Sequence, residues 1–328
     1  MTEEKFKMDE TSKIHVLVTG ASSPVGEQLV QRLLEDPSIG NIVAVCDKGH
    51  PFSLPHHDQI TPVEISMHSQ RHLHGVLFGV AEEKKIQVVI HTAQTTSATE
   101  EGEKVHAQNV EALRNLINFA ERHKTIKRLI IRSCVSVYQV QRDLPALITE
   151  DHPLNMSAGA PQWVRDRVEA DCTACARMGL SALQIVVLRM AEILSIGCGS
   201  QIFDYLQMPV CLRPIGFDPM LNFLTIEDAA MALQKSIHTQ FQGVFNIPGK
   251  DSLPLSEVIN RWGRPSIALP ETAIYWLYRL RRKVRDAEFR YGMNRRRFHY
   301  SGILDGSRAQ RKFSYIPKYS IQWPIMDA

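Results

Sequence analysis

Short apolar runs alternate with amphipathic stretches along the first 190 residues. The runs predict buried strands, whereas apolar positions spaced three and four residues apart predict helices. Strands are predicted at 14–19, 42–46, 60–65, 88–91, 128–132 and 183–189, and helices at 24–34, 70–83, 110–122 and 161–178. Because the two kinds of element alternate and several runs are apolar on both faces, we expect an α/β fold with a doubly wound parallel sheet.

After Arg189 the pattern changes to shorter elements separated by frequent glycine and proline. Strands at 222–226 and 244–247 and helices at 227–238 and 256–261 are predicted there. We therefore expect residues 13–190 to form one domain and residues 191–328 to form a smaller lobe interwoven with it. Residues 1–12 are polar and charged, lack the apolar core of a signal peptide, and are expected to be a disordered tail.

Composition excludes several classes of protein. With 44% hydrophobic and 22% charged residues, the chain can bury a core and is neither collagen-like nor mostly disordered. No stretch approaches the ~20 apolar residues that a membrane-spanning helix needs. The six cysteines show no regular spacing, which favours reduced thiols in a cytoplasmic protein.

A glycine-containing turn follows the first predicted strand and reads TGASSPVG over residues 19–26. Gly20 permits a tight turn, and Gly26 lets the following helix pack closely on the strand, so that backbone N–H groups and the helix dipole can hold a pyrophosphate. The second strand ends at Asp47, 21 residues beyond Gly26. A carboxylate there would bind the 2′-hydroxyl of an adenosine ribose and repel a 2′-phosphate, which favours NAD over NADP.

The order of these motifs resembles the extended short-chain dehydrogenase/reductases, the NAD-dependent epimerase/dehydratase family, whose turn reads TGxxGxxG. Further landmarks lie in the expected order: VVIHTA at 88–93, Asn109-Val110, Val137-Tyr138, Leu188-Arg189, Asp228, GVFN at 243–246, and Asp305 with Ser307-Arg308-Ala309. The resemblance spans about residues 13–323. It implies a Rossmann-type fold with a cofactor lobe and a substrate lobe.

The resemblance also implies a set of cofactor-binding positions. Gly20, Ser23 and Gly26 would line the pyrophosphate and Asp47 the ribose, with Glu64 and Ile65 beside the adenine and Ala93 on the nicotinamide side; Ser22, Val25 and Thr92 complete the set. Ser23 replaces the middle glycine of the family turn. Its Cβ narrows the approach to the pyrophosphate, and its hydroxyl is expected to be available for a phosphate.

The catalytic positions of the family are substituted. Its chemistry uses a tyrosine as acid and base, a lysine four residues later, and a serine; these map to Trp163, Arg167 and Cys134. An indole has no titratable proton near neutral pH, and a guanidinium stays charged without shuttling a proton. None of the eight tyrosines has a lysine four residues later, so no shifted alignment restores the motif.

Two interpretations follow. The chain binds NAD but is weak or inactive in standard hydride transfer, or it is an active nucleotide-sugar or lipid-linked epimerase or dehydrogenase with other proton donors. Tyr138, Cys134, Ser133 and Ser136 are the candidates for a rewired relay, although Tyr138 and Cys134 are also typical of packed core residues. A third interpretation is a membrane-surface or scaffold protein that has lost the cofactor.

The substrate side departs from the family as well. The family's substrate asparagine corresponds to Glu192, close after Arg189. An anion there would disfavour a nucleotide-sugar pyrophosphate unless an arginine offsets it. We expect Arg189, Glu192 and Arg213 on the substrate side.

No metal site is predicted. His91 on a buried strand is typical of a core histidine, Cys172 and Cys175 form a lone CxxC on a helix, and His68 and His72 have no third ligand beside them.

Basic residues concentrate near the carboxyl terminus. Residues 261–318 carry 15 Lys and Arg against 4 Asp and Glu, a balance of +11, so the remaining chain carries −8 of the net +3. A helix over 271–285 begins with apolar and aromatic residues and ends basic. It suits packing on the second lobe, an anionic membrane surface contacted by 271–297, or the phosphates of an anionic substrate. Nucleic acid is not expected, and a homodimer through helices near 101–123 and 161–178 is left open.

Overall fold

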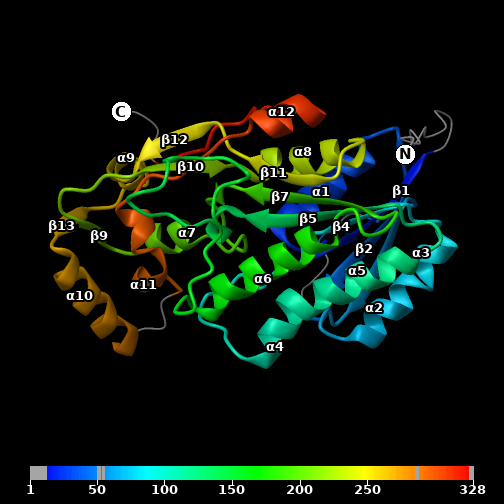
Figure 1. Cartoon of the computed structure of the whole chain (residues 1–328), viewed down its shortest axis with the longest axis horizontal. Helices are drawn as coiled ribbons and strands as arrows, with labels where there is room; N and C mark the ends of the chain where they lie inside the picture. The colour runs from blue at the N-terminus through cyan, green and yellow to red at the C-terminus, as the bar shows by residue number, and fades with distance from the viewer. Residues whose placement is uncertain (1–12, 50–52, 54–55, 285–287, 325–328) are drawn as a thin grey trace.

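The central feature of the computed structural model, which describes residues 13–49, 53, 56–284 and 288–324, is a seven-stranded parallel sheet (Figure 1). The strand order is β11-β7-β5-β4-β1-β2-β3. The strands are β1 (Ile14–Thr19), β2 (Ile39–Asp47), β3 (Ile60–Ile65), β4 (Val88–His91), β5 (Arg128–Cys134), β7 (Gln184–Met190) and β11 (Gly243–Ile247). Successive strands leave β1 in both directions, so β1 and β4 form the switch point at which such sheets bind ligands. The predicted fold class is confirmed, and the predicted tail at 1–12 lies outside the described residues.

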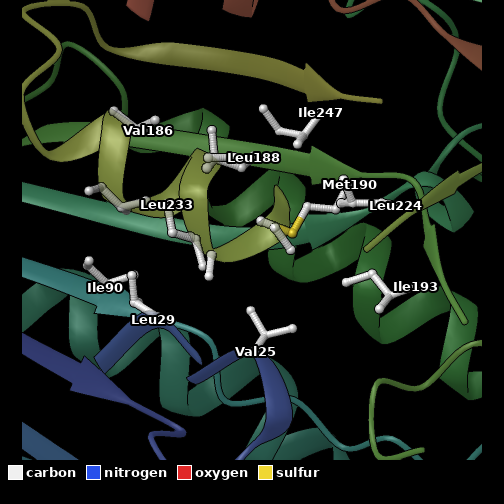
Figure 2. Close-up of a cluster of buried hydrophobic side chains, with 14 of the residues drawn as sticks. Val25, Leu29, Ile90, Val186, Leu188, Met190, Ile193, Leu224, Leu233 and Ile247 are labelled. Carbon is white, nitrogen blue, oxygen red and sulfur yellow. The ribbon is translucent and has the colours of Figure 1, made fainter. Parts of the chain in front are cut away.

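Helices cover both faces of this sheet because the strands are apolar on both sides. Helices α1 (Pro24–Leu34) and α8 (Ile226–Ile237) pack on one face, and α2 (Gln70–Leu77), α5 (Ala112–Arg122) and α6 (Gln162–Arg177) lie over the other. Figure 2 shows Val25 and Leu29 of α1 pointing into the first of these layers, with Leu233 of α8 and Leu188 of β7. Alternate residues of β1 serve the two layers, since Val16 and Val18 belong to one core and Leu17 to the other.

Two predicted helices differ from the observed ones. The helix expected at 70–83 is divided into α2 and a short α3 (Val80–Glu83), with Gly79 at the start of the second segment. The helix expected from residue 110 begins earlier, with α4 (Glu103–His106) and a π-helical turn η1 (Ala107–Glu111) before α5. In this turn the Ala112 amide donates to the Ala107 carbonyl five residues earlier, so the backbone is wider by one residue than an α-helical turn. Such π-helical turns are frequent at functional sites.

Shorter elements build a second assembly beyond the carboxyl ends of the strands (Figure 1). Its core gathers aromatic and aliphatic side chains such as Tyr205, Phe223, Ile274 and Trp323. The strands are β6 (Leu147–Ile148), β8 (Glu192–Ile193), β9 (Cys211–Pro214), β10 (Met220–Leu224), β12 (Asp251–Pro254), β13 (Ser266–Leu269) and β14 (Ile303–Leu304). The helices are α7 (Gln201–Leu206), α9 (Leu255–Arg261), α10 (Glu271–Val284), α11 (Tyr291–Asn294) and the 3-10 turn η3 (Arg296–Phe298). Helix α12 (Ser307–Phe313) packs on β11 and the 3-10 turn η2 (Val135–Val137) on α6, both within the core of the main sheet.

Candidate functional site

The turn between β1 and α1 has no room for side chains at its two glycines. Gly20 has φ +69°, and a Cβ there would lie 2.6 Å from the backbone nitrogen of Ala93. A Cβ at Gly26 would collide with the carbonyl oxygen of Gly20. Strand β1, helix α1 and the end of β4 therefore meet through backbone atoms alone, as they do in turns that accept a pyrophosphate. We call this turn, residues 19–26, the cradle.

Ser23 caps the first turn of α1. Its Oγ accepts a hydrogen bond from the Gly26 amide at 3.1 Å and donates one to the Gly20 carbonyl at 2.7 Å. The hydroxyl proton is thus used within the turn, unlike the free hydroxyl expected from the sequence. Because Pro24 has no N–H and the Gly26 N–H is occupied, Val25 retains the open amide of this first turn.

Asp47 ends β2 beside the same cradle. One carboxylate oxygen accepts the Lys48 amide at 3.1 Å, and the other accepts the side-chain amide of Gln108 at 3.3 Å. Glu64 on the neighbouring β3 accepts the Gly49 amide at 3.1 Å. Gln108 was not foreseen from the sequence, because the π-helical turn that brings it to Asp47 has no signature in the apolar pattern.

Side-chain hydrogen bonds join the ends of β1 and β4 next to the cradle, through Thr19, His91 and Thr92. The Thr19 hydroxyl and the Nδ1 of His91 are 2.7 Å apart in the core, and burial lowers the pKa of His91 to about 4. The Thr92 hydroxyl donates to the Thr19 carbonyl at 2.8 Å. His91 is therefore a neutral core residue that holds the strand ends together, as the sequence pattern indicated.

The far end of the cradle contains buried polar atoms without partners among the described residues: Thr95 Oγ1, Arg167 Nε and Trp163 Nε1. The Arg167 guanidinium stacks 3.8 Å from the Trp163 ring centroid and donates to the Thr95 carbonyl at 3.4 Å. Burial lowers the pKa of Arg167. Unpaired buried donors are costly, and a ligand that accepts from Thr95 and Arg167 would remove that cost.

The relay positions Cys134, Trp163 and Arg167 lie together around one small cavity at the ends of β5 and β7, which Gln94 and Glu192 also line. The Cys134 thiol and the Ser136 hydroxyl are 2.7 Å apart. The Trp163 side chain is buried against Arg167, at the position to which the sequence resemblance assigned the family's acid. The three substituted positions are thus adjacent in space, but their side chains form no proton pathway of the tyrosine–lysine kind.

Tyr138 belongs to a buried network that the sequence did not reveal. Its hydroxyl donates to Asn246 Oδ1 at 2.6 Å and accepts from Arg189 at 3.0 Å, and burial raises the pKa of Tyr138 to about 12. Arg189 also binds both carboxylate oxygens of Asp171, at 2.5 and 3.0 Å. Ser133 donates to Asp171 at 2.7 Å. Tyr138, Ser133 and Arg189 are therefore engaged inside the fold.

Glu192 is offset by an arginine from the basic segment. One of its oxygens accepts from Arg297 at 2.6 Å and the other from Ser200 at 2.5 Å, with the carboxylate nearly buried. The sequence required such an arginine but did not identify it, because the two residues are 105 positions apart. Arg213 lies on β9 with a buried, unpartnered Nε.

A larger cavity of about 240 Å³ lies between the start of α6 and α11. Trp163 and Tyr138 form part of one wall, and Arg295, Arg296 and Arg297 form the opposite wall. No carboxylate occurs among its described lining residues. Arg297 pairs with Glu192 and Arg295 with Glu271, so Arg296 is the arginine of this wall without an ion pair among the described residues. The cavity adjoins the relay positions through Trp163 and Ser136.

Metal-binding chemistry has little support in the described part of the chain, where no group of three or more His, Cys, Asp or Glu residues is placed to hold an ion. The Cys175 thiol donates to Asp171, and burial raises its pKa to about 12. A thiol with a raised pKa is a poor metal ligand or nucleophile.

Comparisons with known proteins agree with this geometry. Residues 16–162 match the model of the NAD dependent epimerase/dehydratase family, which confirms the resemblance seen in the sequence. Uncharacterized proteins of Mycobacterium tuberculosis and Mycobacterium bovis are 26% identical over 313 residues, covering 93% of this chain and 80% of theirs.

Solved structures share the fold over nearly the whole chain. The Bordetella bronchiseptica enzyme WbmG, in complex with NAD, is 18% identical with a TM-score of 0.68, covering 96% of this chain and 92% of that one. The UDP-glucuronic acid 4-epimerase of Bacillus cereus, also in complex with NAD, is 17% identical with a TM-score of 0.68 and covers 94% of both chains.

Proposed function

We propose that this protein, whose residues 16–162 match the model of the NAD dependent epimerase/dehydratase family, binds NAD and does not perform the family's standard hydride transfer. The observation that carries the proposal is the contrast between the two halves of the site. The dinucleotide cradle at Gly20 and Gly26 is intact, whereas Trp163 and Arg167 pack against each other where the acid and its lysine would stand.

The cradle fits NAD at three points. The bare backbone at Gly20 and the open amide of Val25 would face the pyrophosphate, and Asp47 would take the adenosine ribose. Thr95 Oγ1 and Arg167 Nε, which lack protein partners among the described residues, would bind the nicotinamide riboside end. NAD, when bound, supplies a hydride acceptor; the neighbouring side chains of this protein supply hydrogen bonds and a positive charge.

Neither Trp163 nor Tyr138 provides a proton donor of suitable pKa. The Trp163 indole does not titrate near neutral pH. The pKa of Tyr138 is raised to about 12, and its hydroxyl donates its hydrogen bond to Asn246. The Arg167 guanidinium stays cationic at neutral pH. We infer that bound NAD acts as a structural or signalling ligand, with the arginine-lined cavity receiving an anionic group such as a nucleotide-sugar diphosphate.

The competing proposal is a working epimerase or dehydrogenase with Cys134 and Ser136 as a rewired pair. Their 2.7 Å separation at the cavity wall is the observation that favours it. Two structural neighbours were solved with UDP or with UDP-glucuronic acid bound, so these nucleotides are the natural probes.

Cofactor binding is the first measurement. We expect NAD and NADH to raise the melting temperature, because a ligand at 100 times its Kd adds ~2.7 kcal/mol, and NADP and NADPH to raise it much less. Asp47→Asn should reduce the preference for NAD over NADP, whereas Asp58→Asn, an exposed aspartate near the start of β3, should not.

The outcomes separate the proposals. No shift with any of the four dinucleotides would overturn NAD binding. NADH absorbance or sugar isomerisation with UDP-glucose or UDP-glucuronic acid, lost in Cys134→Ala, would establish the rewired enzyme and refute the inactive one.

A second proposed role concerns the membrane surface. Helix α10 presents Tyr275, Trp276, Leu277 and Leu280 to solvent, with Trp276 64% and Leu280 63% exposed. Arg279 lies 5.5 Å from the Trp276 ring centroid. Aromatic and apolar side chains beside arginines suit an interfacial helix on anionic lipid. Within the described chain, no helix is both long enough and apolar enough to cross a bilayer.

Vesicle flotation tests this role. Vesicles containing phosphatidylserine should retain the wild-type chain, and Trp276→Ser with Leu280→Ser should reduce the retained fraction about fivefold, because the exposed apolar anchors are lost. Leu180→Ser, which changes an equally exposed leucine beyond α6, should leave it unchanged. Equal retention by all three proteins, or none by the wild type, would remove the membrane proposal.

A further inference from the structure

A cavity lies at the amino ends of the strands of the main sheet, opposite the ends that carry the NAD cradle. Its volume is about 530 Å³, within the range of small-molecule sites. The amino ends of four strands line it through Ile14 (β1), Val88 (β4), Arg128 (β5) and Gln184 (β7). In Figure 1 these amino ends lie where β1 begins, on the side of the molecule away from α7 and α10. Arg128 is the first residue of β5 and Cys134 the last, so this cavity and the relay positions are about 20 Å apart.

Arg128 is the unusual residue of this cavity. Its side chain is buried, with 7% of the residue exposed, and its terminal nitrogens donate to the Ile237 carbonyl and to Gln184 Oε1. Its Nε has no partner in the described part of the chain. Neither acceptor is an anion, and none of the ion pairs among the described residues includes Arg128.

The positive charge of Arg128 is therefore only partly compensated. The Ile237 carbonyl ends α8, and a helix carboxyl terminus contributes about half a negative charge. A buried cation without a counter-ion costs free energy, and burial lowers the pKa of Arg128 to about 10. An anion entering the cavity would pair with the guanidinium through the protons on its terminal nitrogens that the Ile237 carbonyl and Gln184 leave free.

The rest of the lining defines what kind of anion fits. The lining is mainly apolar, with the nearly buried Ile14 and Val88 at its base and the exposed Ala182 at its side, and Lys85 and Lys127 stand at its exposed rim. No Asp or Glu occurs among the described lining residues. One buried guanidinium next to a mainly apolar wall matches a single carboxylate on an apolar body better than a phosphate, which would need several donors.

We propose that this cavity binds a small amphipathic carboxylate, a medium-chain fatty acid or an aromatic acid, whose carboxylate pairs with Arg128 and whose apolar part lies against Ile14, Val88 and Ala182. The site is independent of the NAD cradle because it draws on the opposite ends of the strands. The protein would thus carry two ligand sites, one at the carboxyl ends and one at the amino ends of the strands of one sheet.

Calorimetry with decanoate tests this inference. We expect decanoate to bind the full-length chain and decanol to bind at least fivefold more weakly, because the alcohol cannot pair with Arg128. Arg128→Met should weaken decanoate binding about tenfold, since it removes the charge and keeps the volume. NAD-induced stabilisation of Arg128→Met shows that the variant is folded.

A second variant keeps Arg128 intact. Ala182 lines the cavity and is exposed, so Ala182→Trp should block the cavity without disturbing the core. Ser181→Trp, one residue away and outside the lining, is the matched control and should bind decanoate normally. Absence of decanoate binding to the wild type, or equal binding by Ala182→Trp, would overturn the proposal. Binding only to a chain without residues 1–12 would identify that segment as the occupant and would overturn it as well.

Discussion

Asp171→Ala is expected to destabilise the protein by about 3–5 kcal/mol, because it leaves the buried guanidinium of Arg189 without its counter-ion. The Asp171 carboxylate is fully buried, and Arg189 is 4% exposed. The same carboxylate accepts from Ser133. Its removal therefore strands one charge and one hydroxyl in the core between β5, β7 and α6.

Urea unfolding at neutral pH measures this effect. Glu169→Ala on the same helix is the matched control, since Glu169 pairs with Arg114 at 3.2 Å on the surface, where such pairs contribute about 0–1 kcal/mol. A loss for Asp171→Ala as small as that of the control would show that Arg189 finds solvent or another partner, contrary to the network described here. Asp171→Asn should lie between the two, because it keeps one acceptor oxygen.

Ser23→Gly is expected to strengthen NAD binding about tenfold, which corresponds to 1.4 kcal/mol. Glycine removes the Cβ from the cradle and frees the Gly26 amide from Ser23 Oγ, so that a second N–H can face the pyrophosphate beside that of Val25. Hydrogen bonds to charged groups contribute about 1.5–3 kcal/mol, and the loss of a serine cap to glycine costs only a few tenths.

Titration of NAD into both proteins, followed by calorimetry, gives the comparison. Ser69→Gly is the control, because Ser69 caps α2 through the His72 amide in the same way but lies away from the cradle. We expect Ser69→Gly to leave the Kd of NAD unchanged. Weaker binding by Ser23→Gly would mean that the serine hydroxyl itself holds the dinucleotide, and the assignment of Val25 as the open donor would be wrong.

Taken together, the two substitutions separate the two halves of the site. The Ser23 substitution acts on a turn that keeps its form with either residue, so its effect reports on the ligand. The Asp171 substitution acts on the network that holds Tyr138 and Arg189, so its effect reports on the fold. If both results are as expected, the position of the family's acid is a packed structural element, and the cradle is the part of the family site that still serves a ligand.

The sequence by itself determined the strands and most helices of the main sheet. The bounds of β1, β3, β4 and α1 agree with those predicted, because buried parallel strands are short apolar runs and Ser23-Pro24 is a local helix start. The glycine turn was visible in the sequence, but only the structure shows that Gly20 is required by the backbone of Ala93 on β4, whereas Gly26 is required by the Gly20 carbonyl within the turn. The assignment of Cys134, Trp163 and Arg167 to the family's catalytic positions rests on the resemblance and stays a prediction.

Only the tertiary structure decided which side chains meet across the fold. The pairing of Tyr138 with Asn246 joins residues 108 positions apart, and that of Glu192 with Arg297 joins residues 105 apart. The carboxyl partner of Arg189, the use of the Ser23 hydroxyl and the incomplete pairing of Arg128 likewise depend on packed neighbours. Apolar periodicity encodes which face of an element is buried, but a hydrogen-bond partner is chosen by distance and direction after the elements have packed.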